Sequence, residues 1–330
     1  MPRAVARDHL PAHPEDDDRQ PRRSGMSETA RVEVRPAGTQ APRRRWLLVT
    51  LSCLAGFLLT VVWSASFVDT TIGGAVTDTL LGEGAGERPL AGAAAGVVFA
   101  FVSGLAGTFT ACNIAVFGAV APMVSEGGQT RRLLAPLGWL GAGMTAVSAL
   151  YGAVVGAVGV AMPQFSTAQN VAGALSPRSI QSMVVFGVIG LAMLYLGLAA
   201  IGLVPDPFAR APRARLVFLG ALIGGFLIGR PFPLFRHLFR HAAESGNPLY
   251  GAAAFTLQSL GNVVLMAVLF LIVARYGGGL RRWLQAEPGR VAAVTAATLI
   301  VAGVFTFLYW DLRLLARREI IPWYPVAPWS

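Results

Sequence analysis

The chain has 330 residues, of which 54% are hydrophobic and 13% are charged, and its mean hydropathy is +0.57. Ordinary soluble domains carry about a quarter charged residues, so this composition excludes a disordered chain, a coiled coil and a disulfide scaffold, and disfavours a soluble enzyme. The net charge of +10 comes from 27 arginines without a lysine. Outside the N-terminal region they stand in short gaps between apolar segments, which is typical of membrane loops and not of nucleic-acid binding.

Residues 1–45 form a separate N-terminal region, which holds an acidic run and scattered Arg, Pro and Ser. We expect a disordered cytoplasmic tail here, and Met26 is an alternative start. Residues 46–67 are apolar over about 20 positions, longer than the 7–15 residues of a signal-peptide core, which favours an uncleaved transmembrane anchor. A polar stretch, 68–89, then predicts an extracytoplasmic loop.

Six further apolar segments follow the loop and predict a polytopic, all-α membrane bundle within residues 90–310. With the N-terminus in the cytoplasm, nine loop arginines lie inside and four outside, as the positive-inside rule requires. Residues 311–330 then form an extracytoplasmic, interfacial tail, although its three arginines oppose the rule. We expect a multi-pass protein of the cell membrane with these segments: 90–124, 137–162, 180–204, 216–235, 249–274 and 291–310.

The six segments divide into two sets of three. A shift of 120 residues lays Gly104–Cys112 over Gly224–Phe232, each in the first helix of its set. An odd number of helices in each set makes the two copies enter the membrane from opposite sides. We therefore expect two inverted three-helix repeats, an arrangement found in many transporters.

Two segments are poor straight spans and predict broken helices. Residues 90–124 carry no charge and would form a helix of about 52 Å, against a hydrocarbon core of about 30 Å. Residues 216–229 are too few to cross the membrane and are followed by Arg230, Pro231 and Pro233. Interrupted segments at matching positions of two repeats indicate a central site, although kinks also occur for packing alone.

Polar residues at these places are the candidate substrate or pathway residues. Gln258 and Asn262 share one face of the sixth segment, where they either join helices or face a pathway. An arginine deep in a span is costly, unless the helix ends early and lets it snorkel to the interface. The candidates are Thr108, Thr110, Asn113, Arg230, Pro231, Pro233, Gln258 and Asn262.

The sequence predicts no metal site and no cofactor. His237 and His241 have only Glu244 as a nearby third ligand, so a solvated amphipathic segment explains them better. There is no P-loop, GxSxG triad or HExxH motif. The two cysteines, Cys53 and Cys112, both stand within apolar segments.

Residues 90–310 resemble the CcdA and DsbD transmembrane family of cytochrome c biogenesis and thiol-disulfide interchange proteins. In that family each of two inverted three-helix repeats carries a proline-flanked cysteine. Thr110-Ala111-Cys112 occupies the first motif here, and Arg230-Pro231-Phe232 occupies the second. The stretch 247–261 also looks like the segment that follows the second motif.

The resemblance implies a transfer of reducing equivalents across the membrane from a thioredoxin-like protein, with Cys112 as the catalytic thiol. Thiol-disulfide exchange of this kind needs two thiols, and Phe232 stands where the second is expected. Cys53 is a substitute partner at a similar depth, although a buried lone cysteine is usually only a small apolar side chain. The presence of an enzyme activity depends on this thiol.

Three functions remain open from the sequence. The first is thiol redox or cytochrome c maturation. The second is a transporter for a small solute on the same inverted-repeat scaffold, with Arg230 favouring an anion. The third is an assembly factor without chemistry. Membrane lipid is the expected partner in every case, and nucleic acid is not.

Overall fold

The computed structural model describes residues 44–64, 71, 74–82, 92–107, 130–168, 171–229, 233–287 and 289–329. All of them belong to one unit of the chain, Val34–Ser330, and the other unit, Met1–Glu33, lies outside the described residues. Every regular element in the described ranges is a helix or a helical turn. The predicted all-α membrane bundle is therefore confirmed.

Six helices among the described residues are long and apolar enough to cross a membrane. A seventh apolar helix, α3, covers only Gly92–Gly107, and the rest of the segment expected at 90–124 lies outside the described residues. The six long helices are α1 (Arg45–Val62), α5 (Thr130–Val158), α6 (Pro177–Ala200), α7 (Pro212–Gly229), α9 (Pro248–Tyr276) and α11 (Arg290–Phe307). The shorter elements are α2 (Gly74–Leu81), η2 (Gly159–Ala161), η3 (Pro163–Phe165), α8 (Pro233–Glu244), α10 (Gly278–Gln285), η4 (Leu308–Leu312) and α12 (Arg313–Arg317).

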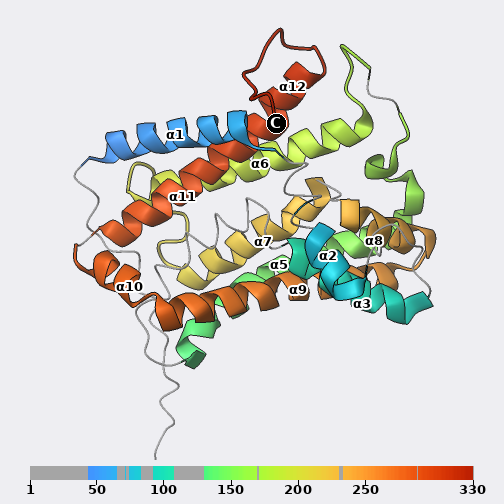
Figure 1. The fold of residues 1–330 in the computed structure, drawn as a ribbon, viewed down its shortest axis with the longest axis horizontal. Coiled ribbons are helices and arrows are strands. Elements are labelled where there is room, and N and C mark those ends of the chain that lie inside the picture. Colours follow the sequence, from blue (N-terminus) through green and yellow to red (C-terminus); the bar gives the residue numbers. More distant parts are fainter. Residues whose placement is uncertain are drawn as a thin grey trace, which may run out of the picture. The chain divides into compact units, whose positions relative to one another are not determined.

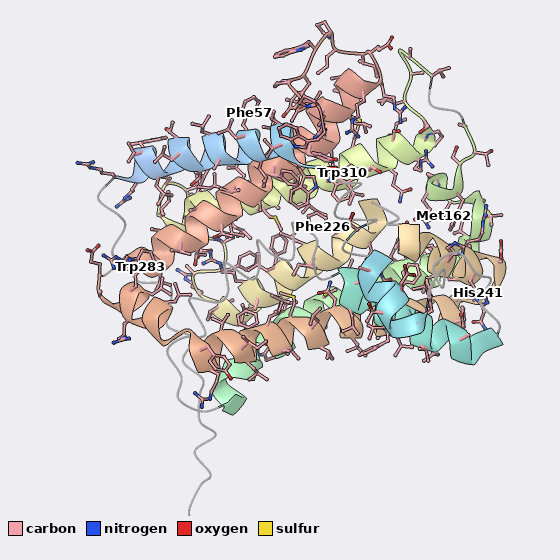
Figure 2. The ribbon with its side chains drawn as sticks, viewed as in Figure 1. Phe57, Met162, Phe226, His241, Trp283 and Trp310 are labelled. Carbon is pink, nitrogen blue, oxygen red and sulfur yellow. The ribbon has the colours of Figure 1, made fainter. Side chains whose placement is uncertain are left out.

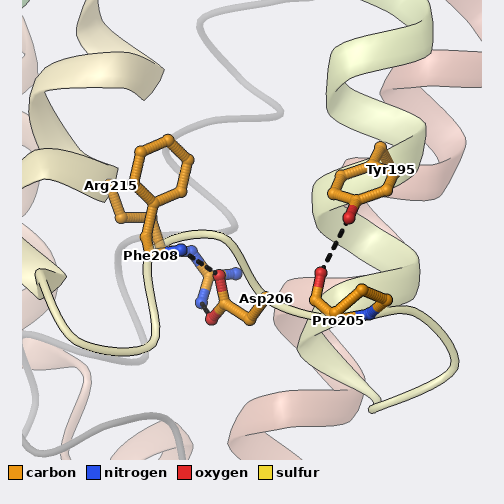
Figure 3. A network of polar contacts seen from close by, with 5 residues as sticks. All are labelled: Tyr195, Pro205, Asp206, Phe208 and Arg215. Carbon is orange, nitrogen blue, oxygen red and sulfur yellow. Dashed lines mark hydrogen bonds and ion pairs between the residues drawn. The ribbon is translucent and has the colours of Figure 1, made fainter.

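Helix α7 begins four residues before the expected start at 216. Pro212 suits the first turn of a helix, where its missing N–H costs nothing. Arg215 is buried and pairs with Asp206 at 3.5 Å, while Asp206 also accepts the backbone N–H of Phe208 (Figure 3). This pairing lets a charged turn extend α7 to 18 residues, about 27 Å, so the expectation that this segment is too short to cross was wrong.

The last helix also continues past its expected end. The segment predicted at 291–310 runs through the π-helical turn η4 into α12, so Asp311 and Arg313 are helical and are not part of a tail. Charges at these positions end a hydropathy segment, but they do not end a helix whose flanking residues are packed.

The helices pack in a continuous order across the bundle. Helix α1 lies on α11, α11 on α6, α6 on α7, α7 on α5, α5 on α9, and α9 on α3 (Figure 1). A two-fold relation between the two sets would exchange α3 with α7, α5 with α9, and α6 with α11. This exchange converts the α3–α9 contact into the α7–α5 contact. The same exchange returns the α5–α9 and α6–α11 contacts to themselves. These contacts agree with a two-fold exchange of the two sets of three helices, whereas the α6–α7 contact falls outside that pattern.

Glycine pairs give this two-fold a residue-level correspondence. A Cβ on Gly104 of α3 would strike the carbonyl of Gln258, three residues before Gly261 of α9. A Cβ on Gly261 would strike the carbonyl of Phe101, three residues before Gly104. The same reciprocal contact joins the other two helices: Gly143 of α5 meets the carbonyl of Val217, and Gly220 of α7 meets that of Leu140.

The glycine correspondence also fixes the offset between the repeats. Gly104 corresponds to Gly220 and Gly143 to Gly261, while Gly190 and Gly303 meet each other in the α6–α11 contact. Gly104 was expected to correspond to Gly224 by the shift of 120 residues. The structural offset of the first helices is four residues smaller, which is one helical turn.

Apolar side chains close one end of the bundle. They come from five helices and are almost completely buried against one another. This set, the apolar cluster, lies toward the end of the bundle that carries Arg45 and the α6–α7 loop. Its central members are Leu140, Met193, Leu216, Met266 and Leu299.

The opposite end of α1 is held by the C-terminal residues. Arg313 is only 1% exposed, and its Nη1 donates to the carbonyls of Thr60 at 2.7 Å and Trp63 at 3.2 Å. These carbonyls belong to the last turn of α1 and the residue after it, where a cation also opposes the negative end of the helix dipole. The Tyr324 hydroxyl shares a hydrogen bond with the Thr60 hydroxyl, so the tail is fixed to the same turn.

Replacing Gly143 by Ala tests the close backbone contact. The added methyl group overlaps the carbonyl of Val217, so we expect a loss of about 1–3 kcal/mol from overpacking, measured as a lower Tm in detergent. Gly138→Ala, on the same helix, is the matched control because no neighbouring atom lies within 4 Å of its Cβ position. Equal effects of the two substitutions would contradict the close contact.

Candidate functional site at the interrupted helix

The structure describes only some of the candidate residues. Gln258 and Asn262 lie on α9, Cys53 lies on α1, and Pro233 is the first residue of α8. The others lie outside the described residues: Thr108, Thr110, Cys112, Asn113, Arg230 and Pro231. The pairing of Cys53 with Cys112 therefore stays a prediction.

Helix α7 ends at Gly229 and α8 begins at Pro233, and residues 230–232 between them lie outside the described residues. In an uninterrupted helix, the N–H of residue i+4 would satisfy each carbonyl of the last turn. Proline at 231 and 233 supplies no N–H, so the carbonyls of Leu227 and Gly229 lose their expected donors. An end of this kind inside a membrane protein needs other donors.

Helix α6 supplies side-chain donors to two carbonyls at this end of α7, one of which is that of Gly229. The Gln181 Nε2 donates to the carbonyl of Ile228 at 2.7 Å, and the Ser182 hydroxyl donates to the carbonyl of Gly229. Both acceptors belong to the last two residues of α7. The carbonyls of the last two residues of α7 thus accept hydrogen bonds from side chains of the neighbouring helix α6.

The cap continues into a buried hydrogen-bond network on α5 and the loop after it. Gln181 Nε2 also donates to the Tyr151 hydroxyl at 3.0 Å, and that hydroxyl donates to Gln164 Oε1 at 2.6 Å. We call Tyr151, Gln164, Gln181 and Ser182 the polar cap. It joins α5, η3, α6 and α7 at one end of the bundle.

The polar cap lies inside the bundle and not at its rim. Ser182 is the sixth residue of α6, so it lies about 8 Å along the helix from its first residue. One turn further along α6, the Phe186 ring packs against Phe226 with ring centroids 5.2 Å apart and stacks on Trp310 with centroids 4.4 Å apart. Phe226 and Trp310 are labelled in Figure 2. The carbonyls of Ile228 and Gly229 are therefore held within the helical bundle.

Two side-chain atoms of the polar cap have no partner. Gln164 Nε2 and Gln181 Oε1 are buried and form no hydrogen bond within the described structure. One is a donor and the other is an acceptor. Buried polar groups are nearly always satisfied, so a free donor and a free acceptor in one network are suited to a small polar ligand or to water.

A second polar group lies nearer the middle of α9. Gln258 is 2% exposed, and neither its Oε1 nor its Nε2 has a partner. Asn262, one turn further, is also buried, and the Ser259 hydroxyl donates to that of Ser148 at 2.6 Å. Ser148 lies three residues before Tyr151 on α5, so these polar residues follow the polar cap along the α5–α9 contact.

Cys53 lies in different surroundings. It is half-buried on α1 and packs beside apolar residues of α6 and α11, such as Leu198 and Ile300. Helix α3, which precedes Cys112 by five residues, packs on α9 at the other edge of the bundle (Figure 1). Described contacts therefore make Cys53 an apolar packing residue of the α1–α11 contact.

The histidines of α8 do not gather a set of metal ligands. Among the described residues no three His, Cys, Asp or Glu side chains come together. Glu244 pairs with Arg240 at 3.7 Å on the exposed face of α8, and the His241 ring packs on the Tyr250 ring at 5.3 Å. The amphipathic interpretation of this segment agrees with these contacts.

The sequence interpretation missed the polar cap. Gln181 and Ser182 stand near the start of a span, where polar residues are ordinary, and Tyr151 and Gln164 look like interfacial residues. The usable signal was indirect: Pro231 and Pro233 leave carbonyls without donors, and these must be satisfied by some other segment.

Comparison with known proteins does not assign a family. No family model matches the chain, and neither the curated proteins nor the solved structures give a significant match.

Removing the cap should destabilise the protein at α7. In Gln181→Leu and Ser182→Ala, a buried carbonyl loses its donor, so we expect each to lower stability by about 1–3 kcal/mol and to speed hydrogen exchange in the last turn of α7. Thr145→Val is the control, because this hydroxyl bonds only carbonyls of its own helix. The capping role is wrong if the control loses as much stability or if exchange in α7 is unchanged.

Proposed function

We propose that this integral membrane protein is a transporter for a small polar solute. Its six membrane-spanning helices in the described part establish the class of protein. The transport function is supported by the end of α7 at Gly229, whose last carbonyls are capped by side chains of α6, and by Pro231 and Pro233 that follow it in the sequence. Interrupted helices at the interface of two inverted repeats form the binding sites of many secondary transporters.

The distribution of polar and apolar residues supports a site open toward one side. The apolar cluster fills the bundle at the Arg45 end, and the polar cap lies toward the other end. A transporter must close one side while the other admits solute. In this proposal the described arrangement is the conformation closed at the Arg45 end, and the inverted two-fold supplies the opposite conformation by exchanging the roles of the repeats.

The proposed orientation places the Arg45 end in the cytoplasm of a cell with the protein in its plasma membrane. Exposed arginines at this end include Arg44, Arg210, Arg213 and Arg275. At the other end, exposed Arg240 and Arg317 are accompanied by the exposed acids Glu244 and Glu319. The excess of basic residues at the Arg45 end favours the cytoplasmic side under the positive-inside rule.

The solute is expected to be an anion with hydrogen-bonding groups. Unpaired amide donors and acceptors are offered by the side chains of Gln164, Gln181 and Gln258. Arg230 directly follows the last residue of α7 in the sequence and is the only arginine between the capped end and Pro233. A guanidinium and amide donors are both suitable groups for a carboxylate or another oxyanion.

Charge-translocation currents from proteoliposomes on a solid-supported membrane would test this function with formate, sulfate and phosphate as probes. We expect a current with at least one probe and a reduction of about tenfold in Arg230→Ala and in Gln258→Leu, since about 1.4 kcal/mol corresponds to one lost hydrogen bond. Thr145→Val should retain the current. No current from the wild type with any probe, or a current that neither substitution changes, would contradict anion transport.

A second proposal is thiol redox transfer, as in the CcdA and DsbD family. Its support is the inverted repeat together with the place of Cys112 in the sequence. The glycine correspondence aligns Cys112 with Ile228 at the capped end of α7, one turn from the Phe232 that the shift of 120 residues gave. Neither alignment places a second cysteine at the position that corresponds to Cys112. In this proposal the Cys112 thiol alone therefore exchanges with a thioredoxin-like protein.

Trapping of a mixed disulfide would test the redox proposal. A thioredoxin variant that lacks its resolving cysteine is activated as a disulfide with thionitrobenzoate and mixed with the protein in detergent. Attack by the Cys112 thiolate forms the mixed disulfide and releases thionitrobenzoate. We expect release by the wild type and by Cys53→Ser, and none by Cys112→Ser. Equal release by all three would contradict a role for Cys112.

A further inference from the structure

The end of the bundle that carries Arg45 has a short amphipathic helix, α10, between α9 and α11. The chain leaves α9 at Tyr276, turns at Gly277, and begins α10 at Gly278. Leu284 is buried against the bundle, while Leu280 and Trp283 are each 49% exposed. Figure 2 places Trp283 and His241 at opposite ends of the bundle. Helix α10 therefore lies where the membrane-spanning helices end.

Arg290 fixes the orientation of α10. Its Nη1 donates to the carbonyl of Trp283 at 2.7 Å, its guanidinium lies 4.8 Å from the centre of the Trp283 ring, and its Nη2 pairs with Glu287 at 2.6 Å. The exposed Trp283 ring is thus held on one side by Arg290 of the next helix. About half of the Trp283 surface remains exposed.

The exposed apolar side chains of this region are the type that lies at the level of lipid headgroups. Tyr276 is 80% exposed and ends α9, and Trp283 follows one short helix later. Tryptophan and tyrosine gather at this level because the ring is apolar and one edge is polar. An amphipathic helix with Leu and Trp on its free face lies in the plane of the interface.

Two arginines beside these rings have no acidic partner among the described residues. Arg275 and Arg282 are exposed, and neither pairs with an acidic side chain in the part of the chain that the structure describes. Glu287, the acid of this loop, already pairs with Arg290. The surface formed by Arg275, Tyr276, Leu280, Arg282 and Trp283, which we call the α10 surface, is apolar and positively charged together.

We propose that the α10 surface binds an anionic phospholipid, with Arg275 and Arg282 at the phosphate and Trp283 and Leu280 beside the upper acyl chains. Arginine recognises phosphate oxygens through paired N–H donors, and basic residues next to a membrane helix attract anionic lipid. The proposal depends on the fold alone and is independent of the solute that the protein carries.

Quenching of Trp283 by brominated lipids tests the proposal directly. The protein is reconstituted in phosphatidylcholine vesicles that contain the same fraction of either brominated phosphatidylglycerol or brominated phosphatidylcholine. The difference between the wild type and Trp283→Phe isolates this ring from the other tryptophans. We expect stronger quenching by phosphatidylglycerol, and a preference about fivefold weaker for each arginine removed, in Arg275→Gln and Arg282→Gln.

Arg240→Gln is the matched control, since Arg240 is an exposed arginine of a short amphipathic helix at the other end of the bundle. This variant should keep the preference of the wild type. If the α10 variants fail to fold, the wild type in 50 and 500 mM salt answers the question, because salt screens exposed charges and should weaken the preference. Equal quenching by the two lipids in the wild type, or a preference that survives both arginine substitutions or high salt, would overturn the proposal.

Discussion

Direct contact between helix backbones at four glycines is the constraint on which this bundle depends. Lipid tails are as apolar as the helices, so membrane helices associate through close packing and backbone approach. Gly143 and Gly261 lie on the central pair α5 and α9, and each contacts the outer helix on its own side. The carbonyls of Val217 and Phe101 occupy the space that a side chain would need. This reciprocal arrangement makes the contact of α3 with α9 the counterpart of the contact of α7 with α5.

The same contacts position the interrupted helix. Gly220 sets the depth of α7 against α5, so the helix ends beside the first turns of α6, where Gln181 and Ser182 reach its last carbonyls. Capping by side chains instead of backbone leaves amide atoms of Gln181 and Gln164 unpaired in a buried place. Packing at the centre of the bundle therefore leads to buried amide atoms without hydrogen-bond partners toward one end of it.

Local patterns were sufficient to predict much of this fold. Runs of apolar residues predicted the long helices, and the spacing of Gln258 and Asn262 predicted that they share one face of a helix, α9, where both are buried. Contacts between distant segments were not predictable in the same way. The start of α7 depends on the pairing of Arg215 with Asp206, and the cap depends on residues that lie 47 positions away from the carbonyls they bind.

The register of the repeats shows why amino-acid identities alone were insufficient to align them. Glycine is abundant in the chain, with 38 residues, so a shift of one helical turn still aligns glycine with glycine. Only the carbonyls that oppose Gly104 and Gly220 distinguish the two registers. Asp311 and Arg313 were assigned to a tail for a related reason, since hydropathy ends at a charge whether or not the charge has a buried partner.

The contact between Arg313 and the end of α1 has a consequence for biosynthesis. The carbonyls of Thr60 and Trp63 are made early, whereas the guanidinium that satisfies them is made about 250 residues later. Until then α1 must remain in the bilayer with water or lipid headgroups at that end. Docking of α1 is thus a late event of assembly, and it places a buried charge only after the other spans have been inserted.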